Sequence, residues 1–586
     1  MARRDTGVPH RSVVRHDVQR VGRSIRRHPR AVEPTPIGGP STPEARQCVA
    51  RLAVDRLPAG SARHRVRRRT SDLARPARPR RQQLRTALRR LRGGRRLCRR
   101  LHPCRVRRAE RDRVIVDEPR PLPRPPWRDQ PAHLRRIFQT PHVVLDDLSS
   151  QYGPVCGLGA GPARMAIVGD PEALRELFAM PNTSFRWNHK FNVLGFVVGK
   201  QSMIVSDGDE HRRRRSSVQS AFSRRRLNGW IPMIVQQTDA AIDRLTERLG
   251  PGSTIDMYTV GRELVLQIVV RSLFGERMSQ RCDEIGDLFQ RPQDYLESSA
   301  FRQFPHPFPH TARARVRADR QALDAIIDAE IAHRRAHPTG DPLDILETLV
   351  ADGSMTDGEI RDQVATLIGA GYDTTSASLA WMLLRATQAP GLWDQLRAEA
   401  DQVLGSRANA GTEPDAGALA ELDLANRVMR ESVRLHPAGV LSPREAAVDV
   451  SVGGYLIPKG TLILWSAHLA GRNAAAWPDP LRFDPDRFVG LDDRQQALAD
   501  MAWVPFGRGA RNCIGFALAQ MELTLIVARL SQRLDLAPVS SEIPDPIGMV
   551  VNRPTGGAPM HVNRRGDPDE TVSTRDGHGT VGSPSR

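Results

Sequence analysis

The sequence lacks the features that mark several large classes of protein. Its 586 residues contain six cysteines, with no Cys-x-x-Cys pair and no cysteine and histidine spacing suited to zinc. No apolar run approaches the ~18 residues needed to span a bilayer, and the N-terminus has no apolar core of a secretory signal. Scattered cysteines without a pairing framework are typical of a reducing compartment. The sequence therefore predicts a soluble, cytoplasmic protein without an integral membrane segment.

Lysine is absent from the first 120 residues, and acidic residues are scarce there. This segment holds 35 of the 87 basic residues, all of them arginine, and only 10 of the 66 acidic ones. The net charge is therefore +25 in residues 1–120 and −4 in residues 121–586, against +21 for the whole chain. A large basic excess often indicates a nucleic-acid or membrane partner. Here that argument applies to the first segment alone.

Large apolar side chains are also sparse in residues 1–118, where arginine, proline, alanine and glycine alternate without a regular period. Such a composition cannot bury a core, so we expect this extension to be disordered. A stiff proline-rich spacer, 119–127, leads into a body whose apolar residues recur mainly at helical spacing. We predict a mainly α domain with small β-sheets over 119–565, followed by a disordered tail over 566–586.

Two interpretations of the extension remain open. One is an arm that binds nucleic acid, although the absence of interleaved aromatic residues for base stacking argues against this role. Alternatively, translation starts downstream, at a Val or Leu codon between Val114 and Leu122, because no methionine lies between Met1 and Met165. The N-terminal sequence of the natively expressed protein distinguishes these interpretations.

A long helix is predicted to begin at Thr356. Thr356 and Glu359 form a capping-box pattern, and apolar residues continue at helical spacing until Pro390. At ~1.5 Å per residue this helix is roughly 45–50 Å long. Its centre reads Gly369-Ala370-Gly371-Tyr372-Asp373-Thr374-Thr375, and such glycines can serve either close helix packing or a local groove. Two short strands are also expected, over 165–168 and over 455–464, the latter folded over a turn at 458–460.

The segment around Cys513 carries the strongest pattern in the chain. Five of its residues fit Phe-x-x-Gly-x-Arg-x-Cys-x-Gly: Phe506, Gly509, Arg511, Cys513 and Gly515. An apolar helical run follows, so the free N–H groups of a helix N-terminus favour a thiolate at Cys513. The glycines let the backbone approach a large flat group closely, and the nearby arginine supplies a cation for an acidic substituent.

This segment resembles the haem-binding loop of the cytochrome P450 family, in which Cys513 stands at the position of the iron ligand. Glu431 and Arg434 fit the family's Glu-x-x-Arg, and Arg487 belongs to a Pro-Asp-Arg-Phe version of its Pro-Glu-Arg-Phe element. The resemblance implies that these three residues form a buried ion-pair network. The cofactor it implies is heme b, iron protoporphyrin IX.

Further motifs occur in the family's order over most of the body. His211 and Arg215 resemble the bacterial His-x-x-x-Arg that holds haem propionates, and Arg444 matches another propionate-binding arginine. Thr374 is implied to hydrogen-bond dioxygen, and Asp373 to relay protons from solvent. Thiolate ligation favours O–O cleavage. The resemblance thus implies a monooxygenase, whereas a peroxygenase or isomerase of the same fold, which needs no proton relay, is the alternative.

The electron source lies outside this chain. Residues 1–120 and 566–586 contain no phosphate-binding glycine loop after a strand and no four-cysteine iron–sulfur spacing. We therefore expect electrons from NAD(P)H through a separate ferredoxin and its reductase, with the arginines at 212–215 and 224–226 as a docking patch. The substrate is not specified. Phenylalanine and proline in 285–310 suggest a lipophilic molecule under this segment.

Overall fold

The computed structural model describes residues 119–137, 139–189, 192–250, 253–298, 300–303, 308–339 and 344–566. The chain divides into two units, 1–111 and 112–586, and every described residue belongs to the second. The expectations for the extension 1–118 and for the tail beyond 566 therefore lie outside the described residues. Within the described part, none of the helices has the length and apolar character that a membrane crossing needs.

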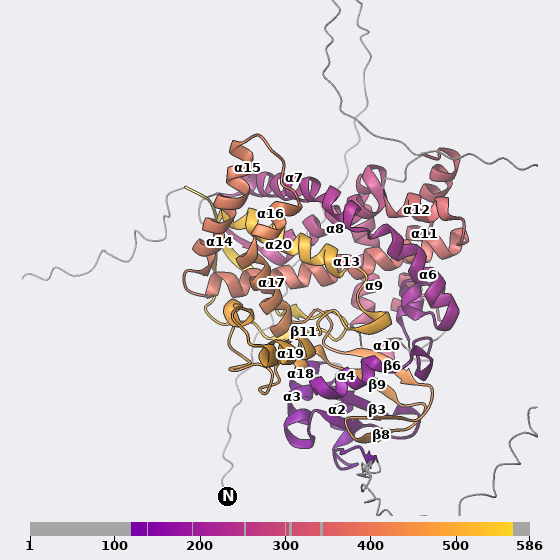
Figure 1. The fold of residues 1–586 in the computed structure, drawn as a ribbon. Helices are drawn as coiled ribbons and strands as arrows, with labels where there is room; N and C mark the ends of the chain where they lie inside the picture. The colour runs from indigo at the N-terminus through magenta and orange to yellow at the C-terminus, as the bar shows by residue number, and fades with distance from the viewer. Residues whose placement is uncertain are drawn as a thin grey trace, which may run out of the picture. The chain divides into compact units, whose positions relative to one another are not determined.

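The described unit is mainly helical, as the periodicity predicts (Figure 1). Its longer helices are α3 Pro141–Tyr152, α4 Pro171–Ala179, α6 Gly208–Ala221, α7 Arg224–Arg248, α8 Met257–Ser279, α9 Cys282–Leu296, α11 Ala312–Ala336, α12 Ile345–Asp352, α13 Asp357–Gln388, α14 Leu392–Ala400, α17 Asp423–Leu435, α19 Asp493–Ala502 and α20 Phe516–Arg533. Shorter helices are α2 Gln130–Arg136, α5 Leu194–Val197, α10 Ala300–Gln303, α15 Ser406–Asn409, α16 Ala416–Glu421 and α18 Ala467–Gly471.

Four small sheets complete the described fold. The largest has the strand order β2-β3-β9-β6-β4, and the others are β1-β8-β7, β10-β13-β5 and β11-β12. The strands are β1 Arg120–Pro121, β2 Val155–Leu158, β3 Met165–Val168, β4 Phe185–Arg186, β5 Ser253–Asp256, β6 Ser442–Ala446, β7 Val450–Val452, β8 Tyr455–Ile457, β9 Leu462–Trp465, β10 Leu534–Pro538, β11 Pro546–Ile547, β12 Arg553–Pro554 and β13 Pro559–Arg564.

The predicted strand over 165–168 is confirmed as β3, but the expected fold-back over 455–464 is wrong. β8 and β9 flank the turn at 458–460 without pairing with each other. β9 instead lies between β3 and β6 at the centre of the largest sheet, whereas β8 pairs with β7 and β1. Burial of β9 between two strands outweighs the local preference for a hairpin.

The long helix α13 organises the core. The capping box predicted for its start is present, since the Thr356 hydroxyl accepts the Glu359 N–H and the Glu359 carboxylate accepts the Thr356 N–H. Apolar side chains are buried along most of its length, and it packs against α8, α11, α17 and α20. A helix buried on all sides must come from the centre of a large domain.

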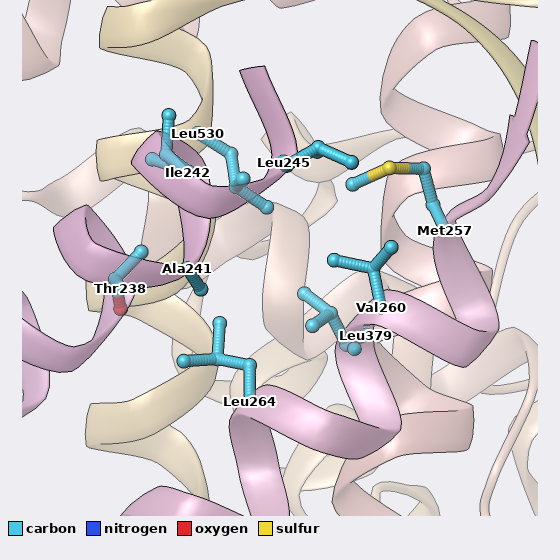
Figure 2. A pocket seen from close by; sticks show the side chains of 10 residues that line it. Thr238, Ala241, Ile242, Leu245, Met257, Val260, Leu264, Leu379 and Leu530 are labelled. Atoms are coloured by element: carbon cyan, nitrogen blue, oxygen red, sulfur yellow. The ribbon is translucent and has the colours of Figure 1, made fainter. Parts of the chain in front are cut away.

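Figure 2 shows an apolar pocket in this helical core. It lies among α7, α8, α13 and α20, and no predicted site residue lines it. The lining residues are Thr238, Ala241, Ile242, Leu245, Met257, Val260, Gly261, Leu264, Leu379 and Leu530.

The proline-rich spacer belongs to the fold. Strand β1 pairs in parallel with β8, and Leu122 is only 6% exposed. A translation start as late as Leu122 would therefore remove a strand that the fold uses.

Candidate functional site

The loop before α20 presents Cys513 to an open space. Of the described cysteines, Cys156 and Cys282 are buried, whereas Cys513 is exposed. Its backbone N–H donates a hydrogen bond of 2.8 Å to the carbonyl oxygen of Phe506. Gly509 adopts φ +73°, which only glycine adopts easily, and a side chain at Gly515 would point into unfilled space. The loop is therefore folded so that the thiol and the adjoining backbone are accessible.

The charges and burial around Cys513 act on its thiol in opposite directions. Burial raises the pKa of the thiol, although its surface is exposed. The N–H of Gly515 and the charge of Arg215 lower the pKa. A positively charged group bound beside the thiol would stabilise the thiolate further.

Helix α6 brings two of the predicted cofactor residues next to this loop. His211 and Arg215 are one helical turn apart, so they share a face of α6. Arg215 donates a hydrogen bond of 2.8 Å to Oδ1 of Asn512, next to the cysteine. Burial, together with the charges of Arg511 and Arg215, lowers the pKa of His211 to about 4.

Two further cations meet in the same region without enough acidic partners. Burial lowers the pKa of Arg444, on β6, to about 10, with a further contribution from Arg511. The pKa of Arg511 is also lowered to about 10, first by burial. The Nε atoms of both arginines are buried and have no hydrogen-bond partner among the described residues. Asp207, whose Oδ1 lies 3.5 Å from Arg511, is the acid in contact with this pair.

The observations on the loop and the cations fit a flat, doubly anionic prosthetic group. Buried guanidinium groups with unused donors require an anion, and two carboxylates match the charges present. The accessible thiol supplies a soft ligand for iron beside them. The residues that the sequence predicts for cofactor binding are thus brought together, although they come from α6, β6 and the loop before α20.

The glycines at the centre of α13 serve helix packing. A Cβ atom at Gly369 would lie 3.1 Å from the ring of Phe289 on α9, and one at Gly371 would lie 3.4 Å from Val269 on α8. The glycine pair therefore admits neighbouring helices, while a groove at this part of α13 stays a prediction. Between them, Ala370 is exposed although it lies in the middle of a core helix.

Thr374 lies one turn after Ala370 on the more open side of α13. Its hydroxyl donates a hydrogen bond of 2.6 Å to the carbonyl oxygen of Ala370. Asp373, in contrast, is only 3% exposed. Oδ1 of Asp373 accepts a hydrogen bond of 2.9 Å from the Tyr258 hydroxyl and lies 3.7 Å from Nε of Arg262. The Asp373 carboxylate, which is expected to exchange protons with solvent, is therefore buried on α13 against Tyr258 and Arg262 of α8.

The buried ion-pair network implied by the sequence is confirmed. Arg434 donates two hydrogen bonds of 2.7 Å to the Glu431 carboxylate, and Arg487 donates one of 2.8 Å. The side chains of Glu431 and Arg434 are 0% exposed. The remaining guanidinium donors of Arg434 reach backbone carbonyls, including that of Pro480 at 2.8 Å. This network ties α17 to the segment that precedes the cysteine loop.

The arginine clusters are less available for a partner than their sequence suggests. Arg213 and Arg214 both form ion pairs with the Glu359 carboxylate, which is 7% exposed. Burial raises the pKa of Glu359, but hydrogen bonds from Arg213, the Thr356 N–H and Arg214 lower it to about 2. Two members of the predicted patch therefore stabilise the start of α13.

Comparison with known proteins agrees with this arrangement. The family model described as Cytochrome P450 matches residues 119–558. The chain belongs to the cytochrome P450 family. Putative cytochrome P450 139 of Mycobacterium tuberculosis is 33% identical over 393 residues, covering 65% of this chain and 87% of its own. Cyclooctat-9-en-7-ol 5-monooxygenase of Streptomyces melanosporofaciens is 30% identical over 417 residues, covering 70% and 88%.

The structural comparison supports the same fold. A cyanobacterial P450 solved with bound retinoic acid, CYP120A1, superimposes with a TM-score of 0.67 at 23% identity, covering 76% of this chain and 100% of its own. The enzyme class is that of a P450 monooxygenase, and the family implies a haem cofactor.

Several residues around the site escaped the sequence analysis. Tyr258 and Arg262 contact Asp373 from a helix more than a hundred positions away, and Glu359 was interpreted only as a helix cap. Trp187 contacts both Arg444 and Arg511. No local pattern marks these residues, because their roles depend on side chains that only the fold brings near.

Proposed function

We propose that Cys513 ligates the iron of heme b and that the surrounding cations bind the propionates of the porphyrin. The observation that carries the proposal is the meeting of an accessible thiol with buried guanidinium donors that lack partners. When bound, the haem supplies the iron centre at which dioxygen is activated. The propionate-binding residues are His211, Arg215, Arg444 and Arg511, while Phe506, Gly509 and Gly515 shape the loop under the porphyrin.

The domain that carries this function is proposed to span 119–565. The match to the family model over 119–558 supports this assignment, as does strand β13, which ends at Arg564 and pairs with β5 and β10.

Asp373 and Thr374 are proposed to supply protons for the activation of dioxygen. The Thr374 hydroxyl would be able to donate a hydrogen bond to dioxygen after releasing the Ala370 carbonyl, which it contacts in this structure. Asp373 is one residue away, and its Oδ1 accepts the hydrogen bond from Tyr258, so a proton relay through Asp373 would involve its contacts with α8.

The substrate is proposed to be a lipophilic molecule. The names of two Streptomyces relatives denote an unsaturated alcohol and an alkene as substrates: the cyclooctat-9-en-7-ol monooxygenase and pentalenene oxygenase, the latter 29% identical over 410 residues. The predicted roof over 285–310 includes α9, whose Phe289 packs on Gly369 of α13. Residues 304–307 of this segment lie outside the described part.

A difference spectrum of the reduced, CO-bound protein tests the ligand assignment. We expect the band typical of thiolate ligation, and we expect Cys513→Ser to lose it. Cys282→Ser is the matched control, because this cysteine is buried in α9 and should leave the spectrum unchanged. A wild-type band typical of histidine ligation would contradict the proposal. Product formation with peroxide alone, without reductant and dioxygen, would instead support the peroxygenase alternative.

Electrons are proposed to come from NAD(P)H through a ferredoxin reductase and an acidic ferredoxin that docks beside α6. Arg212 has a side-chain exposure of 72% and forms an ion pair with exposed Asp209, and Arg224 and Arg225 at the start of α7 are also exposed. Charge complementarity of this kind accelerates association and weakens with salt.

Ferredoxin-dependent reduction measured over a range of salt concentrations tests the docking site. We expect Arg212→Glu to slow reduction about tenfold at low salt and much less at high salt. Arg281→Glu is the control, since Arg281 forms a similar exposed i,i+3 pair with Glu284 on α9. A rate that is independent of salt, or an equal effect of both variants, would refute docking at this site.

A further inference from the structure

Trp187, which follows strand β4, contacts the two guanidinium groups that have unused donors. The Cζ atom of Arg511 lies 3.9 Å from the centre of the indole ring, and that of Arg444 lies 5.4 Å away. Both distances are within the ~6 Å over which a cation is attracted to the face of an aromatic ring. Arg444 also lies over Phe178 at 5.2 Å and Phe185 at 5.0 Å, so its charge is surrounded by aromatic rings.

The backbone of Trp187 is fixed by the segment that leads into α6. Oδ1 of Asp207 accepts the Trp187 N–H at 2.8 Å, and Oδ2 accepts the Asn188 N–H at 3.1 Å. The side-chain amide of Asn192 donates to the carbonyl oxygen of Trp187 at 2.7 Å. Asp207 also lies 3.5 Å from Arg511, so one carboxylate holds both the tryptophan backbone and the cation on its ring.

The indole ring of Trp187 stabilises two neighbouring cations without neutralising their charge, which a carboxylate would do. Two buried guanidinium groups repel each other, and Arg444 has no carboxylate partner among the described residues. A second carboxylate would neutralise the pair, whereas an aromatic face stabilises a cation and leaves its full charge for a ligand. Among the described residues, nothing accepts a hydrogen bond from Nε of either arginine, whereas Nη1 and Nη2 of Arg511 donate to the carbonyl oxygens of Met203 and Ser206.

We propose that Trp187 is a positioning residue that keeps Arg444 and Arg511 oriented and available for the carboxylates of the haem. This inference rests on the proposed haem site and adds to it a residue outside the motifs of the sequence. Trp187 acts through the two arginines, so its effect should depend on the carboxylates of the ligand.

Transfer of haem from the holoenzyme to excess apomyoglobin measures this effect. We expect Trp187→Leu to lose haem about tenfold faster than the wild type, because the variant lacks the aromatic face that holds the two cations. Trp187→Phe retains a smaller aromatic face and should lie between the two. Trp127→Leu is the matched control, since Trp127 is 85% exposed, and it should leave the rate unchanged.

Haem dimethyl ester, which lacks the carboxylates, separates positioning from a merely structural role. We expect the wild type and Trp187→Leu to lose the ester at the same rate, and the same should hold for Trp187→Phe if the leucine variant does not fold. Equal acceleration with haem and with the ester would overturn the inference. Failure of the haem proposal itself has a different signature, since the wild type would then show no thiolate band.

Discussion

The Tyr258 hydroxyl donates a hydrogen bond of 2.9 Å to Oδ1 of Asp373, which joins α8 to the centre of α13. Nε of Arg262 lies 3.7 Å from the same oxygen, and burial raises the pKa of Tyr258, so the phenol stays protonated and acts as the donor. The acid next to Thr374 is thus held by α8, and its availability for proton transfer depends on residues of another helix.

Replacing Tyr258 with Phe removes one donor from a buried carboxylate. We expect the free energy of unfolding to fall by about 1 to 3 kcal/mol, because the lost bond is not replaced by water. Chemical denaturation measures the change. Tyr372→Phe is the control, because it removes a neighbouring hydroxyl but leaves the bond to Asp373 intact. If both variants lost the same free energy of unfolding, the hydrogen bond from Tyr258 to Asp373 would not contribute the stability expected of it.

Replacing Thr374 with Ala should separate electron consumption from product formation. The hydroxyl is proposed to position a proton donor beside bound oxygen, so its loss should divert electrons to peroxide while the haem spectrum is retained. The ratio of product to NAD(P)H consumed measures the coupling. Thr374→Ser keeps a hydroxyl and should stay near the wild type. Unchanged coupling in the alanine variant would show that Thr374 has another role.

Replacing Glu431 with Gln should destabilise the fold strongly. The variant leaves Arg434 and Arg487 without their shared carboxylate in a fully buried site. Removing one member of such a network costs about 3 to 5 kcal/mol. Urea unfolding of this variant is compared with that of Glu172→Gln, which breaks an exposed pair with Arg175 and should change stability far less. Similar losses of stability in both variants would contradict the expectation that breaking a buried ion-pair network costs more than breaking an exposed pair.

Glu522 on α20 makes stability depend on pH. Its side chain is buried, Oε1 has no partner among the described residues, and burial raises its pKa well above the usual value. The folded state therefore holds this proton more tightly than the unfolded state, so its contribution to stability is present below the unfolded pKa of about 4.3 and is lost as pH rises toward the folded value.

Glu522→Gln should remove this pH dependence. We expect a higher Tm than the wild type at pH 7 and a difference that shrinks toward pH 4. Thermal unfolding across this range measures it, with Glu247→Gln, at an exposed position on α7, as the control. A gap that widened at low pH would mean that the carboxylate is charged in the folded state.

Local patterns predicted the parts of the fold that local physics governs. The capping box at Thr356 specifies where α13 begins, because side chain and backbone satisfy each other within one turn. The buried network of Glu431, Arg434 and Arg487 was implied by the family resemblance rather than by spacing alone. The hairpin expected over 455–464 failed because neighbouring strands compete for the same backbone groups.

By itself, the sequence determined the mainly helical class, the separation of a basic extension from a slightly acidic body, and the loop that presents Cys513. These features depend on composition, periodicity and a contiguous motif. Only the tertiary structure decided that Trp187 contacts Arg444 and Arg511, that Tyr258 holds Asp373, and that the glycines of α13 admit α8 and α9. Such contacts join residues far apart in the chain, and they form only where packing of the whole core brings the helices and strands together.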